Sequence, residues 1–160
     1  MLILAHSPFV FGYAKPVPVN FHNLHHPKRD MIWVALAGPA MNLVLAFFCV
    51  VVWKALATLV GGAAQTAPGV AAQVLPPLML MAQGGILINI VLAVFNALPV
   101  PPLDGGRVMV GLLPQPLSAK LARVEPFGFI ILFVLLMTRT LDPIIDLPME
   151  FLLKAFLGLV

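Results

Sequence analysis

Residues 96–107 read Asn-Ala-Leu-Pro-Val-Pro-Pro-Leu-Asp-Gly-Gly-Arg, and they end a long apolar run with a carboxylic acid, Asp104. Three prolines precede this acid and two glycines follow it. Proline removes a backbone donor and breaks helices, and glycine frees the backbone, so the stretch predicts an unwound turn. Unwound backbone at membrane depth persists only where protein buries it or where it lines a wet cavity. A carboxylate in such a turn is therefore a candidate functional group.

The composition indicates an integral membrane protein. Of the 160 residues, 61% are hydrophobic and 9% are charged, and the mean hydropathy is +1.05. Soluble domains carry about 25% charged residues. The length predicts a single membrane domain, residues 1–160. The net charge of +3 is interpreted as loop topology and does not indicate nucleic-acid binding. Cys49 is the only cysteine, so the chain has no disulfide framework and no cysteine-based zinc site.

Two uncharged stretches are long enough to cross a bilayer core of about 30 Å. They are residues 31–53 and 75–98, of 23 and 24 residues. The Gly61-Gly62 pair is predicted to end the first span, and the second is predicted to start at Pro76-Pro77. Residues 61–74 are therefore expected to form a short uncharged loop.

The remaining apolar segments are shorter. Residues 117–125 predict an amphipathic helix at the membrane interface. Residues 127–138 and 147–160 predict short apolar helices. In the second of these, Glu150 and Lys154 are spaced to pair.

Residues 1–30 are expected to lie at the interface. Within them, Lys15–Val19 alternates prolines with apolar residues and predicts an extended segment. The predicted fold is all-α: a polytopic membrane protein with about three to four transmembrane or half-inserted helices and a short extended segment near the N-terminus.

Basic residues flank both predicted spans on the same side. Three precede the first span and three follow the second: Lys15, Lys28, Arg29, Arg107, Lys120 and Arg123. The intervening segment 61–74 carries no charge. Cytoplasmic loops of membrane proteins are enriched in Lys and Arg, so both basic flanks are predicted to be cytoplasmic. Asp104 is then expected near the cytoplasmic face of the cell membrane.

The chemistry of Asp104 is open on general rules alone. A carboxylate in a wet intramembrane pocket could bind a metal, relay protons or bind a cation. The alternative is that it caps a helix or pairs with Arg107, three residues further along the chain; general rules favour the functional role.

Three segments of the chain match, in order, the motifs of one known family. They are Phe-Gly-Tyr-Ala-Lys-Pro-Val-Pro-Val-Asn at residues 11–20, Gly38-Pro39-x-x-Asn42, and Asn96-x-x-Pro99-x-x-x-Leu103-Asp104-Gly105-Gly106. This pattern resembles the site-2 protease family (peptidase family M50), intramembrane zinc metalloproteases. The resemblance covers approximately residues 7–145.

The resemblance implies a zinc site. In the family, two histidines of an HExxH helix and the motif aspartate hold the metal, and the glutamate activates water. Asp104 maps onto the third ligand. Asn42 and Asn96 map onto positions that shape the site or hold substrate backbone, although interhelical hydrogen bonding would also explain them. Pro99, Gly105 and Gly106 belong to the same site-shaping motif. The implied partners are the lipid bilayer and a transmembrane protein substrate, and the implied source is bacterial.

The chain departs from this pattern because it contains no HExxH motif. Its histidines are His6, His22, His25 and His26, and no glutamate stands between any two of them. The spacing of the last three could bind metal, but neighbouring asparagines and a proline favour a turn at the membrane surface.

We therefore hypothesise an intramembrane zinc endopeptidase whose other two zinc ligands come from a segment upstream of this chain. The chain by itself contains no HExxH catalytic residues and is expected to be inactive. The alternatives are a non-catalytic membrane binding or scaffold protein and a small proton-linked transporter that uses Asp104 with Arg107.

Overall fold

The computed structural model of this chain describes residues 27–66 and 68–158, and every regular element within these ranges is a helix. The predicted all-α class is therefore confirmed. The extended segment expected at Lys15–Val19 lies outside the described residues, and so do all four histidines.

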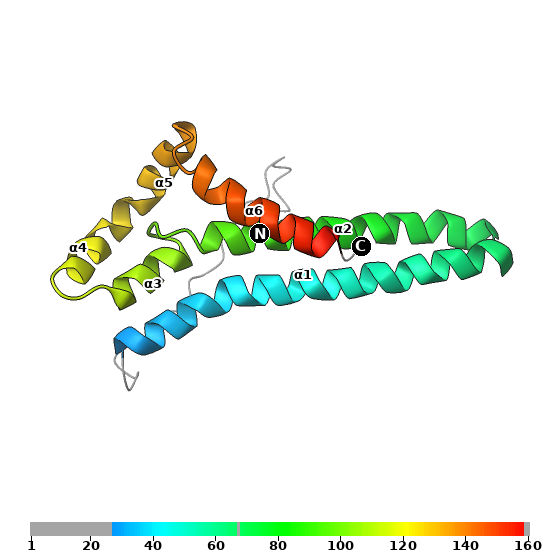
Figure 1. Cartoon of the computed structure of the whole chain (residues 1–160), viewed down its shortest axis with the longest axis horizontal. Coiled ribbons are helices and arrows are strands. Elements are labelled where there is room, and N and C mark those ends of the chain that lie inside the picture. Colours follow the sequence, from blue (N-terminus) through cyan, green and yellow to red (C-terminus); the bar gives the residue numbers. More distant parts are fainter. Residues whose placement is uncertain (1–26, 67, 159–160) are drawn as a thin grey trace, which may run out of the picture.

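Two long helices form an antiparallel hairpin. Helix α1 covers Pro27–Thr66 and helix α2 covers Pro68–Asn96 (Figure 1). Their segments Lys28–Gly61 and Gln73–Asn96 are long and apolar enough to cross a membrane. The predicted spans 31–53 and 75–98 lie in this hairpin, with only the last two residues of the second beyond the end of α2.

The predicted loop at 61–74 is wrong. Helix α1 continues through Gly61 and Gly62 to Thr66, and α2 begins at Pro68. The alanines and glutamine that follow the glycine pair are good helix formers, and a glycine costs a helix only about 1 kcal/mol. Pro68 occupies the first position of α2, where a helix needs no backbone N–H from that residue. The connection between the helices is therefore much shorter than the composition suggests.

The predicted start of the second span at Pro76-Pro77 is also wrong. Both prolines lie inside α2, which begins eight residues earlier. Proline inside a transmembrane helix is tolerated because neighbouring helices and local adjustments satisfy the freed backbone groups.

The second half of the chain consists of shorter helices. They are α3 (Asp104–Leu112), α4 (Leu117–Val124), the 3-10 helix η3 (Glu125–Phe127), α5 (Gly128–Met137) and α6 (Asp142–Leu157). Helix α3 lies along the first part of α1, while α4 and α5 lead away and α6 returns over α2 (Figure 1).

The helical run Leu117–Met137 meets α6 at a bend of 82°. The described residues therefore contain two candidate membrane spans, or three if this bent pair forms one span. Helix α6 starts five residues before the predicted 147, because proline in its first turn favours helix initiation there.

The core joins α1, α2 and α6. The buried residues of the first cluster come from the two long helices: Ala46, Val50, Ile86, Ile90 and Val94. One face of α6 packs against this cluster through Ile145, Met149, Leu152, Leu153 and Phe156. A Cβ added at Gly85 would lie 2.7 Å from the Cys49 sulfur, so glycine allows the close approach of α1 and α2.

A second buried cluster anchors the segment that follows α2. It consists of Leu98, Leu132 and Leu141, from the turn after α2, from α5 and from the residue before α6. The unwound turn is thus held by packing against two helices.

Candidate functional site

The turn that carries Asp104 is unwound, as the prolines and glycines predict. Helix α2 ends at Asn96, residues 97–103 form turns and bends, and Asp104 is the first residue of α3. Short backbone hydrogen bonds close the turn, from Val100 to Leu98 at 2.8 Å and from Leu103 to Val100 at 3.0 Å. This pairing within the turn lets irregular backbone persist beside a membrane span.

Gly105 and Gly106 place the first turn of α3 directly on this backbone, and both are buried. A Cβ at Gly105 would collide with the carbonyl oxygens of Ala97 and Leu98. A Cβ at Gly106 would lie 2.6 Å from the carbonyl carbon of Val100. Neither position has room for a side chain, so the two glycines allow α3 to begin where it does.

The carboxylate of Asp104 lies against the backbone of α1. A Cβ added at Gly38 would be 2.5 Å from Asp104 Oδ2 and 3.5 Å from its Cγ. Asp104 itself is half-buried. The structure therefore brings together the Gly-Pro-x-x-Asn segment and the Asp-Gly-Gly segment. Sequence reasoning did not identify Gly38 as the neighbour of the carboxylate.

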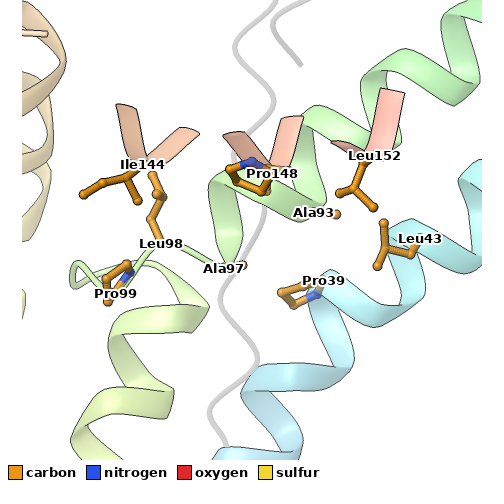
Figure 2. A pocket seen from close by; sticks show the side chains of 10 residues that line it. Pro39, Leu43, Ala93, Ala97, Leu98, Pro99, Ile144, Pro148 and Leu152 are labelled. Carbon is orange, nitrogen blue, oxygen red and sulfur yellow. The ribbon is translucent and has the colours of Figure 1, made fainter. Parts of the chain in front are cut away.

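Two cavities flank the contact between α1 and the turn. The larger, of about 280 Å³, lies between α1, α2 and α6, and Figure 2 shows Ile144 and Pro148 of α6 opposite Pro39 and Ala97. Its lining is apolar: Pro39, Leu43, Ala93, Val94, Ala97, Leu98, Pro99, Ile144, Pro148 and Leu152. The smaller, of about 140 Å³, is lined by Ala35, Leu36, Pro39, Ala97, Pro99, Gly105, Val108 and Met109.

The other predicted site residues lie around these cavities. Pro99 is exposed and lines both cavities, together with Pro39 and Ala97. Asn42 on α1 and Asn96 at the end of α2 are half-buried and line neither of the two.

Arg107 pairs with a residue other than Asp104. Its guanidinium donates to Glu125 Oε1 at 3.1 Å, and both side chains are nearly half exposed. This ion pair links α3 to η3. The pairing of Asp104 with Arg107, one of the alternatives left open by the sequence, is not what the structure shows.

Asp104 is of a residue type that binds zinc. Carboxylate oxygen is an accepted zinc ligand, and catalytic zinc takes three protein ligands and a water. Within residues 27–66 and 68–158, no three His, Cys, Asp or Glu side chains gather around one point. The described residues thus supply one carboxylate, beside which Gly38 leaves space because it has no Cβ. They do not form a complete metal site.

These features define an α-helical membrane protein in which a proline-rich break in a span presents a carboxylate to the neighbouring helix. The model of Peptidase family M50 matches residues 54–138, more than half of the chain, and the chain belongs to this family. The matched range includes the Asn96–Gly106 motif.

A protein of Bacillus subtilis (strain 168) named "Putative zinc metalloprotease YwhC" is 35% identical over 153 residues, which cover 91% of this chain. The chain spans 65% of the length of that relative. No solved structure matches this chain.

Proposed function

We propose that the polypeptide containing this chain is a zinc-dependent endopeptidase that cleaves membrane-embedded protein substrates, and that Asp104 is one of its zinc ligands. Family membership and the name of the Bacillus relative support this proposal. The observation that carries it is the position of the Asp104 carboxylate, which lies in an unwound turn against Gly38.

The residues around Asp104 are suited to peptide hydrolysis within a membrane. A bound zinc ion lowers the pKa of its water to about 7 and polarises the substrate carbonyl. Cleavage requires an unwound substrate, and its exposed backbone groups need hydrogen-bond partners at membrane depth. We assign this role to the side-chain amides of Asn42 and Asn96. Pro99, Gly105 and Gly106 shape the turn beside the carboxylate.

The two remaining zinc ligands and the general base are proposed to come from an HExxH helix upstream of this chain. The 160-residue chain alone is accordingly predicted to be catalytically inactive.

We propose that the site lies near the cytoplasmic face, on the basis of the basic residues around it. The Lys28 ammonium group donates to the carbonyl oxygen of Leu113 at 3.2 Å, so the start of α1 and the end of α3 lie at the same end of the hairpin. Lys28, which precedes the first span, therefore lies beside the segment that follows the second span, as the positive-inside tendency requires of two cytoplasmic segments.

The test uses the native polypeptide. An affinity tag added in frame at the genomic locus recovers the whole polypeptide that carries this chain. Zinc content and cleavage of a transmembrane peptide are then measured in liposomes. We expect stoichiometric zinc and zinc-dependent cleavage, both lost in Asp104→Asn and both retained in the control Asp146→Asn, which alters an exposed acid of α6. Wild-type zinc content in Asp104→Asn would contradict the ligand assignment. Cleavage by the isolated 160-residue chain would contradict the assignment of the missing ligands.

A non-catalytic membrane binding or scaffold protein is the second candidate, because the chain contains no HExxH motif. Translation of the roughly 200 nucleotides upstream of Met1 distinguishes the two. An in-frame HExxH on a hydrophobic segment supports the protease, and its absence supports the scaffold. The transporter alternative loses support because Arg107 bonds to Glu125 rather than to Asp104.

A further inference from the structure

The carboxyl-terminal end of α3 is held by two hydrogen bonds from other elements. The Ser118 hydroxyl, at the start of α4, donates to the carbonyl oxygen of Val110 at 2.7 Å. The Lys28 ammonium group, in the first turn of α1, donates to the carbonyl oxygen of Leu113 at 3.2 Å. The last carbonyl groups of a helix have no partner within the helix, so both bonds satisfy groups that would otherwise need water.

Ser118 is unusual among the described residues. It is 3% exposed and is the one polar side chain that is buried in the part of the chain that the structure describes. Removing a buried hydroxyl leaves its carbonyl partner without a hydrogen bond, which costs more than the net value of the bond itself. Its hydrogen bond to Val110 therefore links the start of α4 to the end of α3.

Helix α3 connects the two hydrogen bonds at its carboxyl-terminal end to Asp104 at its amino-terminal end. It has nine residues and lies antiparallel to the first part of α1 (Figure 1). At its carboxyl-terminal end, a Cβ added at Gly111 would lie 2.5 Å from Ile32 Cγ1 and 3.0 Å from the carbonyl oxygen of Lys28. At its amino-terminal end, Asp104 lies against Gly38. A shift of α3 along α1 would therefore move the carboxylate away from Gly38.

We propose that Ser118 and Lys28 are positioning residues for Asp104. They fix the carboxyl-terminal end of α3 and thereby set the register of Asp104 on α1. The register itself follows from the contacts of α3, whereas its importance for the metal rests on the proposed function. The ion pair between Arg107 and Glu125 has a lesser part, because solvent screens a pair that is nearly half exposed on each side.

The register is measured by thiol protection. Ala35 is 4% exposed and lines the small cavity between α1 and α3, so Ala35→Cys places a thiol in this interface. The background is Cys49→Ala, and Gln115→Cys, at an exposed position between α3 and α4 and outside the candidate membrane spans, defines unprotected labelling. N-ethylmaleimide labelling at residue 35 is followed by mass spectrometry on the native polypeptide in membranes. Labelling of a buried thiol reports local opening.

We expect slow labelling of Ala35→Cys and an increase of about fivefold when Ser118→Ala is added, which corresponds to the loss of one hydrogen bond. Lys28→Met should give a smaller increase of about twofold, because Lys28 is exposed and its bond is longer. Thr138→Val is the matched control. It removes a hydroxyl from the carbonyl oxygen of Val134 at the end of α5 and should leave labelling unchanged.

The second measurement is zinc release to a chelator. Loss of a residue that orients a metal ligand typically costs 10- to 100-fold in metal affinity, and we expect about tenfold faster release in Ser118→Ala. A residue that only stabilised the fold would lower the unfolding temperature without changing zinc release.

The possible results separate the two proposals. Unprotected labelling of Ala35→Cys, or labelling unaffected by Ser118→Ala, overturns the register. If the Ser118→Ala protein does not accumulate, the same test is made with Lys28→Met: labelling of Ala35→Cys that this substitution leaves unchanged overturns the register. Increased labelling with unchanged zinc release overturns the positioning role. A wild-type polypeptide that binds no zinc overturns the proposed function. The labelling rates still test the register of α3 on α1 in that case, because they do not depend on zinc.

Discussion

Gly38→Ala tests the contact between α1 and Asp104 most directly. The new Cβ would lie 2.5 Å from Asp104 Oδ2, whereas ordinary contact begins at 3.4 Å, so the oxygen must retreat by the difference, 0.9 Å. Oδ2 is the end of a side chain and can move without shifting the backbone. Alanine is favoured over glycine within a helix by about 0.5–1 kcal/mol. Because Pro39 follows, the ring of this proline disfavours a Cβ on the preceding helical residue and offsets this gain. The fold is therefore expected to survive with little change in stability.

The metal site should not survive this substitution. Zinc ligands lie within about 0.2 Å of their ideal distances, and the required displacement of the carboxylate is more than four times larger. A misplacement of about 1 Å costs roughly 100-fold in rate, which corresponds to about 2.7 kcal/mol of transition-state stabilisation. We expect cleavage by the native polypeptide to fall about 100-fold, with weaker zinc binding as the cause.

The assay combines three measurements on the native polypeptide: zinc affinity by chelator competition, cleavage of a transmembrane peptide, and thermal unfolding. Gly84→Ala is the matched control, since it lies on α2 and its Cβ would have nothing within 4 Å. The control should keep wild-type zinc affinity and activity. Wild-type zinc affinity in Gly38→Ala would refute the ligand geometry, and a large loss of stability would refute the claim that Asp104 can move freely.

Three further substitutions test the packing around the site. Gly105→Ala places a methyl group against backbone carbonyl oxygens that cannot retreat, so we expect the free energy of unfolding to fall by about 1–3 kcal/mol; unchanged denaturation in detergent would contradict this. Gly85→Ala should destabilise similarly by its contact with Cys49, and adding Cys49→Ala should recover most of the loss in a double-mutant cycle. Arg107→Gln breaks the exposed pair with Glu125 and should cost no more than about 1 kcal/mol without changing cleavage; a larger cost would show a structural role for this pair.

The sequence predicted the elements that carry the site. Two long apolar stretches identified the hairpin, and the prolines and glycines of residues 96–107 identified the unwound turn before α3. The spacing of Glu150 and Lys154 predicted an ion pair, and their side chains lie 2.5 Å apart. The resemblance to the site-2 protease family is confirmed by the match to Peptidase family M50. Each of these features could be predicted because it follows from the composition, the residue spacing or a short motif of one segment of the chain.

The helix ends were harder to predict. A glycine pair at Gly61-Gly62 and a proline pair at Pro76-Pro77 are signals for loops in water, yet both lie within helices. In an apolar environment an unpaired backbone group costs several kcal/mol, which outweighs the weak intrinsic preferences of single residues. Local propensity therefore gave wrong ends for α1 and α2, whereas hydropathy correctly predicted that both segments are long apolar helices.

The contact of Asp104 with Gly38 of α1 could not be predicted from local patterns. The carboxylate is located by three glycines, Gly38, Gly105 and Gly106, whose contacts are with backbone or with the carboxylate itself. Hydrophobic periodicity reports which side chains face a core, and a glycine adds nothing to that pattern. The contribution of a glycine lies in the close approach that it allows between neighbouring groups. Asp104 approaches α1 through the space that Gly38 leaves, and Gly38→Ala tests its proposed role as a ligand by filling that space with a single methyl group.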